Sequence, residues 1–117
     1  MKVYGIKNCD TVKKALNWLD KNNITYEFHD YKKSGISIEK LNEWSAQLGW
    51  EPLLNKKGTT WKKLDTETQN KIQTKEAAFN LMQEKTSVIK RPLIEGGSKL
   101  LLGFNEADYL EVLGENN

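Results

Sequence analysis

Residues 3–31 read VYGIKNCDTVKKALNWLDKNNITYEFHDY, and this stretch decides the fold. It opens at 3–6 with a short β-prone run, and the apolar residues that follow recur at the i, i+3, i+4 and i+7 spacing of an amphipathic helix. Aromatic and polar residues then alternate over 25–31, which predicts a second strand. A strand, a helix and a strand within about thirty residues form a βαβ unit, so we expect two parallel strands joined by a right-handed crossover.

The rest of the chain predicts a helical middle, a β-hairpin and a last helix. Residues suited to cap helices stand before apolar helical patterns at Ser37, Thr66 (with Gln69), Thr74 and Asn105. The runs 87–90 and 99–103, joined by a glycine turn at 96–97, predict an antiparallel pair of strands. We therefore expect a single α/β domain over 1–117 with a four-stranded mixed sheet. The predicted element order is βαβ, a helical insertion at about 36–85, then ββα.

The composition limits the partners of the chain. Its 117 residues include 18 basic and 16 acidic side chains, a net charge of +2 that is too balanced to predict direct binding to nucleic acid. No apolar run approaches the roughly 18 residues that a membrane span requires. The first residues are strand-like and lack the apolar region of a signal peptide. We expect a cytoplasmic monomer that does not associate with membranes.

The single cysteine, Cys9, lies between the first predicted strand and the first predicted helix. Unpaired amide groups and the helix dipole stabilise an anion at such a position, and the thiolate is the reactive form of cysteine. A lone cysteine can also be a small buried apolar residue. The flanking residues are polar: Lys7, Asn8, Asp10 and Thr11. We therefore favour a reactive thiol at the carboxyl ends of the parallel strands, where ligand sites of such sheets occur.

A single thiol restricts the chemistry that is available. The residue three positions after Cys9 is Val12, so the chain has neither a C-x-x-C motif nor an internal disulfide. A mixed disulfide at Cys9 must be resolved by an outside thiol, for which glutathione or a similar small thiol is the natural co-substrate. We expect no bound cofactor. The only histidine, His29, has no cysteine or second histidine nearby in the sequence, so we expect a structural role and no metal site.

Arg91 is the only arginine, and it directly precedes Pro92 at the end of the third predicted strand. A guanidinium is the best planar partner for carboxylates and oxyanions, which makes Arg91 a candidate site residue. An ordinary solvated pair with Lys90 is the alternative. The tryptophans are expected in the core or at its edge: Trp18, Trp44, Trp50 and Trp61.

Several blocks of sequence resemble the arsenate reductase (ArsC)-like family. They are VYGIKNCDTVKKA (3–15), LGWEPLLNKKGTTWKKL (48–64), and IKRPL (89–93) followed by LLLGF (100–104). The resemblance is greatest to the YffB branch, which is related to the Spx-type regulators that bind RNA polymerase. It extends over nearly the whole chain and implies a thioredoxin-like sheet with an inserted helical subdomain.

The resemblance also implies roles for individual residues. Cys9 matches the nucleophile of the family, and Arg91 matches the active-site arginine that precedes a proline. Pro92 matches that proline, whose peptide bond is expected to be cis. Asn8 and Thr11 match neighbours that line the thiolate loop, and together with Pro92 they are the residues expected to bind the substrate or thiol.

Departures from the family pattern narrow the function. Arsenate reductases of the family place three arginines around the oxyanion, and here the other two positions fall at Asn55 or Lys56 and at Phe104. Each lost charge-assisted hydrogen bond weakens arsenate binding by about 1.5–3 kcal/mol. Val12 removes the C-x-x-C switch of many Spx-type regulators.

Together, the residues and the resemblance favour an enzyme. The expected activity is that of a glutathione-dependent thiol/disulfide reductase, a monothiol oxidoreductase. An Spx-like regulator that binds an RNA polymerase subunit and a weak arsenate reductase are the alternatives.

Overall fold

The computed structural model describes residues 1–114 and divides into two compact units. The sheet unit is formed by Met1–Ser34 together with the segment from Arg91 onward. The helical unit is Gly35–Lys90, and the insertion expected at about 36–85 falls within it.

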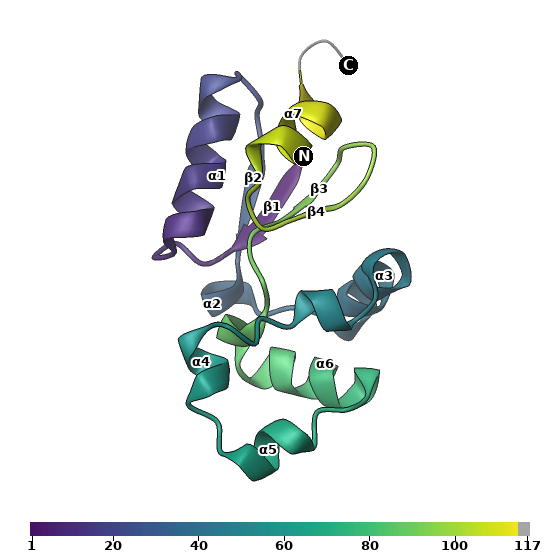
Figure 1. Cartoon of the computed structure of the whole chain (residues 1–117). Coiled ribbons are helices and arrows are strands. Elements are labelled where there is room, and N and C mark those ends of the chain that lie inside the picture. Colours follow the sequence, from purple (N-terminus) through teal and green to yellow (C-terminus); the bar gives the residue numbers. More distant parts are fainter. Residues whose placement is uncertain (115–117) are drawn as a thin grey trace. The chain divides into compact units, whose positions relative to one another are not determined.

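Four strands form one mixed sheet in the spatial order β2-β1-β3-β4 (Figure 1). They are β1 (Lys2–Gly5), β2 (Glu27–Asp30), β3 (Leu93–Glu95) and β4 (Leu101–Leu102). Strand β1 pairs in parallel with β2 and antiparallel with β3, and β3 pairs antiparallel with β4. The expected sheet, with its βαβ start and its closing hairpin, is confirmed.

Helices α1 (Asp10–Lys21) and α7 (Glu106–Leu113) cover the same face of this sheet. Side chains from both helices and three strands form the core there: Val3, Ala15, Trp18, Leu19, Ile94, Leu101, Tyr109 and Val112. Tyr109 is almost fully buried, and its hydroxyl donates a 2.6 Å hydrogen bond to the carbonyl of Gly103, just after β4. This bond joins α7 to the end of the sheet. The short helix α2 (Tyr31–Ser34) ends the first segment of the unit.

The third strand lies further along the chain than the sequence predicted. Residues 87–90 do not form it: Thr86–Val88 is the 3-10 helix η2, and Ile89 forms a bridge with Leu54 inside the helical unit. Strand β3 begins only after Pro92, because proline has no amide hydrogen for the ladder. Arg91 and Pro92 therefore lead into a strand of the sheet instead of ending one.

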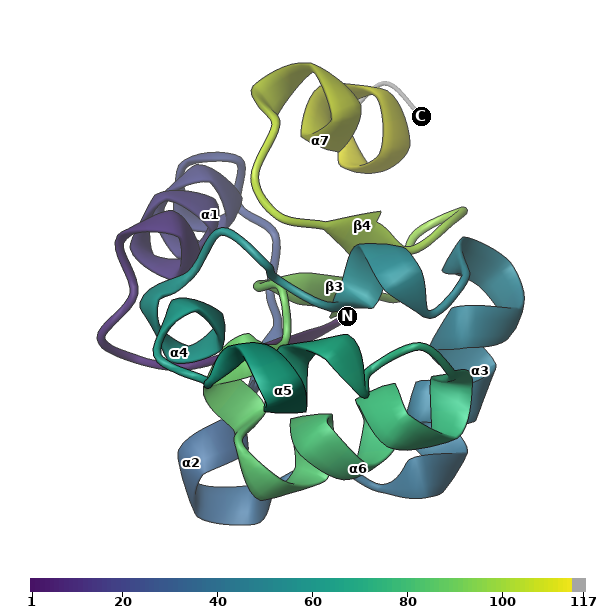
Figure 2. The ribbon, with the colours of Figure 1, turned by 60° about the horizontal axis from the view of Figure 1, so that its bottom comes forward.

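The helical unit consists of short helices that follow one another around an apolar centre. Its elements are α3 (Ile38–Leu48), η1 (Glu51–Leu53), α4 (Thr59–Lys62), α5 (Thr66–Asn70), α6 (Lys75–Glu84) and η2. Helix α3 packs against α6 (Figure 2). Among the helices of residues 1–114, none is long and apolar enough to cross a membrane.

The predicted packing of the tryptophans is confirmed. Trp44 and Trp61 are buried in the helical unit and Trp18 in the sheet unit, while Trp50 is half-buried at the edge of a core.

Most of the predicted caps are confirmed. Ser37, Thr74 and Asn105 each accept a backbone hydrogen bond from the first turn of α3, α6 and α7, respectively. The prediction of Thr66 is wrong: the cap of α5 is Asp65, whose carboxylate accepts a 2.7 Å bond from the Thr68 amide. Hydrogen bonding by the Thr68 side chain, and then by its amide, lowers the pKa of Asp65.

Removal of the hydroxyl group should affect stability differently at two buried tyrosines. Tyr109→Phe leaves the Gly103 carbonyl without its bond and should lower the free energy of unfolding by about 1–2 kcal/mol. The Tyr31 hydroxyl is buried and has no hydrogen-bond partner among the described residues, so Tyr31→Phe should be neutral or stabilising. Urea unfolding at neutral pH measures both changes. A greater loss in Tyr31→Phe than in Tyr109→Phe would contradict this assignment.

The same tyrosines predict a loss of stability in alkali. Burial raises the pKa of Tyr31 and Tyr109 well above the ordinary value of 10.0. The folded state therefore holds these protons more tightly than the unfolded state. This contribution is complete below pH 10 and is lost as the pH rises toward the folded-state values. Each group adds a slope of at most about 1.4 kcal/mol per pH unit, which Tyr31→Phe or Tyr109→Phe should remove in unfolding titrations.

Candidate functional site

The strand register brings several chain segments to one edge of the sheet. In the parallel pair Gly5 lies opposite Asp30, and in the antiparallel pair Tyr4 lies opposite Leu93. The loop that leaves β1, the residues that follow β2 and the residues that precede β3 therefore lie at the same edge. This edge is the carboxyl end of the two parallel strands, where sheets of this class bind ligands.

Cys9 is the N-cap residue of α1, as the sequence suggested. Its backbone is extended (φ −134°, ψ 121°), and its carbonyl accepts the 2.9 Å bond from the Lys13 amide that begins the helix. The thiol is free and only partly buried, so the alternative of a sulfur enclosed in the core does not apply.

Helix α1 differs from the other long helices at this cap. The N-cap side chains of α3, α6 and α7 each accept a backbone hydrogen bond, whereas the Cys9 side chain makes none. A thiol is not among the side chains that cap helices well. The first-turn amides of α1 consequently keep their capacity to stabilise negative charge on sulfur or on a bound group.

Asn8 and Thr11 flank the thiol on the two sides of the helix start. Asn8 lies in the turn between β1 and α1, and Thr11 is the second residue of α1. Both are exposed, so the surroundings of the sulfur are polar and open to a ligand. Their binding role stays a prediction.

Arg91 and Pro92 lie at the same edge of the sheet. The peptide bond between them is cis, as the resemblance implied. Pro92 is buried, and its carbonyl accepts a 2.8 Å hydrogen bond from the Gly103 amide, which holds the start of β3 against the end of β4. Arg91 is partly exposed. The strand register thus places the loop that carries the thiol and Arg91, the only arginine of the chain, at the same edge of the sheet.

Tyr31 is a residue of this edge that sequence reasoning missed. It follows β2 directly, and its ring centroid lies 6.3 Å from that of Tyr4 and 5.9 Å from that of His29. Burial raises the pKa of Tyr31 far above its usual range, the nearby Tyr4 adds to this, and the positive charge of Arg91 acts in the opposite direction. A neutral phenol therefore lies within the electrostatic reach of the guanidinium.

The signal for Tyr31 was present in the alternation of β2. If Tyr26 and Phe28 share one face of the sheet, His29 and Tyr31 must lie on the other.

The ring of His29 packs 4.9 Å from that of Tyr4, which fits the structural role expected for it. Within residues 1–114, no three side chains of the metal-binding types gather into a group.

A close contact positions the helix that carries Cys9. A Cβ atom placed on Gly5 would lie 3.0 Å from one methyl of Val12 and 3.4 Å from the other. Val12 is fully buried and stiff at χ1, because it is β-branched. The end of β1 therefore approaches the first turn of α1 as closely as a residue without a side chain allows.

We expect Gly5→Ala to destabilise the protein by about 1–3 kcal/mol, because Val12 or the start of α1 must move. Val12→Ala alone should also destabilise, through the cavity it creates. In the double variant the new methyl enters that cavity, so the loss should be smaller than the sum of the two single losses. Urea unfolding of the four proteins measures this coupling, and strict additivity would show that the contact does not constrain the helix.

The sheet order, the thiol at the first βα junction and the cis-proline before β3 together define a thioredoxin-like α/β protein of the ArsC type. The model of the ArsC family matches residues 4–112, and the chain belongs to this family.

Similar proteins support the assignment. An uncharacterized protein of Haemophilus influenzae is 47% identical over 107 residues, which cover 92% of this chain and 93% of the relative. A solved structure of a YffB protein is 45% identical with a TM-score of 0.87, covering 96% of this chain and 97% of the other. An arsenate reductase (ArsC) related protein from Brucella melitensis is 44% identical with a TM-score of 0.72, covering 94% and 91%.

Spx regulators are more distant relatives. The global transcriptional regulator Spx of Streptococcus mutans is 25% identical over 101 residues, which cover 85% of this chain and 72% of the regulator. The resemblance inferred from the sequence blocks, to the ArsC family with YffB and Spx relatives, is confirmed.

Proposed function

We propose that this protein is a thiol/disulfide reductase that uses Cys9 as its only nucleophile and glutathione as the reducing co-substrate. The observation that carries the proposal is the partly exposed thiol at the N-terminus of α1, where the Cys9 side chain makes no cap hydrogen bond to the first-turn amides. Ionised sulfur is the nucleophile of disulfide exchange, and this position favours it.

The reaction takes place in two exchanges. The Cys9 thiolate attacks the glutathione sulfur of a mixed disulfide, the S–S bond breaks, and the substrate leaves as a thiolate that takes up a proton. A glutathione thiolate then attacks the Cys9–glutathione disulfide, which restores the Cys9 thiolate and releases oxidised glutathione. One mixed disulfide and one glutathione thus become one substrate thiol and one oxidised glutathione dimer, so the electrons balance.

Arg91 would orient the incoming disulfide. Glutathione and its conjugates carry carboxylates, and a guanidinium can hold a carboxylate through two parallel hydrogen bonds. The place of Arg91 beside Pro92, at the edge that also carries the thiol loop, supports this role.

A regulatory role is the second candidate, and the similarity to Spx favours it. In that case the chain would dock on a subunit of RNA polymerase, as the Spx resemblance implies. Oxidation could not act through an internal disulfide, because Val12 occupies the place of a second cysteine and is fully buried. Capture of RNA polymerase by the purified protein, equal for wild type and Cys9→Ser, would support docking without redox control.

Cys9→Ser tests the proposed function. A hydroxyl at this position is not an effective nucleophile toward disulfides, so turnover of a glutathione mixed disulfide should fall by more than about a hundredfold. Serine is a better N-cap than cysteine, so the free energy of unfolding of the same variant should be unchanged or higher by up to about 1 kcal/mol in urea unfolding. Retained turnover in a folded Cys9→Ser protein would refute the proposal.

A matched pair of variants tests Arg91. Arg91→Gln should raise the KM for the glutathione disulfide several-fold, whereas Lys90→Gln removes an equal charge one residue away and should leave KM unchanged. Equal effects would show that only general charge matters. Arsenate serves as a further substrate in the same assay, and with a single arginine in the chain we expect no more than weak reduction.

A further inference from the structure

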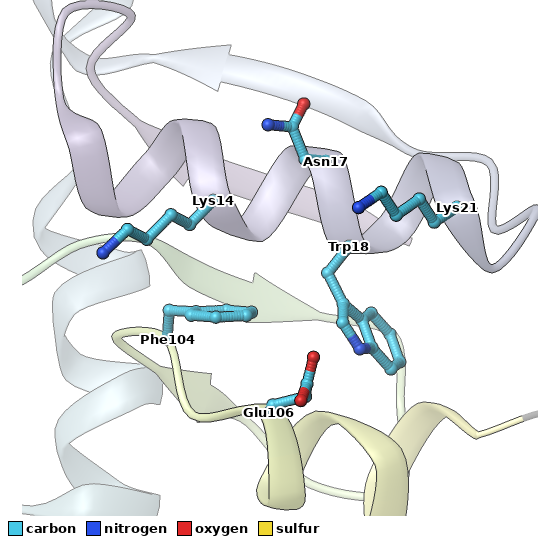
Figure 3. A pocket seen from close by; sticks show the side chains of 6 residues that line it. All are labelled: Lys14, Asn17, Trp18, Lys21, Phe104 and Glu106. Atoms are coloured by element: carbon cyan, nitrogen blue, oxygen red, sulfur yellow. The ribbon is translucent and has the colours of Figure 1, made fainter.

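A cavity of about 250 Å³ lies in the sheet unit, between α1 and the start of α7 (Figure 3). Its lining combines two aromatic rings, three charged groups and an amide: Lys14, Asn17, Trp18, Lys21, Phe104 and Glu106. Ligand sites for whole drug-sized molecules measure roughly 300–1,000 Å³, so this cavity suits one end of a ligand.

The aromatic walls of the cavity are fixed by the core. The rings of Trp18 and Phe104 both pack edge-on against Tyr109, with centroids 5.5 Å and 5.0 Å away. Tyr109 is itself held by its hydrogen bond to Gly103. The two walls therefore keep their shape without a ligand, which lowers the entropic cost of binding one.

The charged groups of the cavity are not used within the structure. The carboxylate of Glu106 points into the space between Phe104 and Trp18, and the amines of Lys14 and Lys21 extend from α1 on either side (Figure 3). Within the described residues, none of these three side chains takes part in an ion pair or hydrogen bond. Two positive groups and one negative group thus surround apolar walls with their charges free.

This charge pattern matches a zwitterion. An ammonium group between the rings would meet the Glu106 carboxylate and could lie over the face of an aromatic side chain. A carboxylate on the neighbouring carbon would meet the Lys14 amine. A simple anion would be repelled by Glu106, and a simple cation by the two lysines, so an α-amino acid head group fits best.

The Lys14 end of the cavity is within reach of the thiol. Lys14 lies five residues beyond Cys9, about 7.5 Å along the helix axis at 1.5 Å per residue, whereas Lys21, at the far end, lies twelve residues beyond it, about 18 Å away. An extended γ-glutamyl-cysteine unit covers about 7–10 Å, the length of two to three residues. On the other side, Phe104 follows Gly103, whose amide is bonded to the Pro92 carbonyl at 2.8 Å. Both walls of the cavity therefore begin at the edge that carries the candidate site.

We propose that this cavity binds the α-amino acid head of the γ-glutamyl group of glutathione, with Glu106 receiving the ammonium and Lys14 the carboxylate. The inference rests on the proposed function, which requires an outside thiol at Cys9. The inference adds the residues of this protein that would recognise that thiol.

S-methylglutathione is the probe, because it keeps the head group and cannot react with Cys9. Titration followed by the indole N–H resonance of Trp18, assigned with Trp18→Phe, gives the dissociation constant. Glu106→Gln and Lys14→Gln should each weaken binding by up to about fivefold, the effect of about 1 kcal/mol for one exposed ion pair. Asp108→Asn is the matched control, since it removes an acidic group from the same first turn of α7 outside the cavity, and it should change nothing.

Two truncated ligands identify the group that is recognised. N-acetyl-S-methylglutathione lacks the ammonium, and S-methyl-cysteinylglycine lacks the γ-glutamyl group. The N-acetyl compound should bind wild type as weakly as S-methylglutathione binds Glu106→Gln, and S-methyl-cysteinylglycine, which also loses the carboxylate contact, should bind more weakly still. The Glu106→Gln substitution should weaken neither ligand further.

The possible outcomes separate this inference from the proposed function. An unshifted Trp18 resonance, or equal effects of Glu106→Gln and Asp108→Asn, would overturn the inference even if Cys9 turns over disulfides. Binding at Trp18 that requires Glu106 would support it even if Cys9→Ser proves to have no effect on turnover. In an active enzyme, Glu106→Gln should raise the KM for glutathione, whereas Asp108→Asn should leave it unchanged.

Discussion

The pairing of β1 with a strand on each side is the constraint on which the rest of the sheet unit depends. Strand β1 has four residues, and it is parallel to β2 and antiparallel to β3. Because of these directions, the chain leaves β1, leaves β2 and enters β3 at the same edge of the sheet. Segments that carry a thiol, a phenol and a guanidinium and are far apart in the sequence reach the same edge of the sheet for this reason. A shift of β3 by one residue would turn every side chain of that strand to the other face.

The start of α1 shows stability and chemistry competing for one position. Serine, threonine and asparagine cap the other long helices, and each satisfies an amide of the first turn. Cysteine does not do this for α1. The helix compensates through its length and through Val12, whose burial against Gly5 anchors the first turn. Because packing holds the helix in place, its N-cap position is available for a reactive group.

The sequence predicted the parts of this fold that depend on local patterns. The βαβ start, the final hairpin and three of four caps follow from periodicity and from side-chain chemistry next to the backbone, which nearby residues determine. The third strand was misplaced because 87–90 is as apolar as 93–95, and only long-range pairing with Leu54 decides that Ile89 belongs to the helical unit. Cys9 could be predicted because its signal is local, whereas the burial of Tyr31 and the cavity beside Trp18 depend on contacts between distant segments.

Val12 stands where a C-x-x-C motif has its second cysteine, so Cys9 can form a disulfide only with an outside thiol. This determines how the oxidation state of Cys9 depends on the thiols in solution. A dithiol that closes its own disulfide releases two glutathione molecules for each oxidised dimer, so its equilibrium shifts when the whole pool is diluted. A lone sulfur exchanges one for one: it takes up a single glutathione and releases a single glutathione. In the proposed reaction, the fraction of chains in the mixed-disulfide form would therefore follow the ratio of oxidised to reduced glutathione and would not depend on their total concentration.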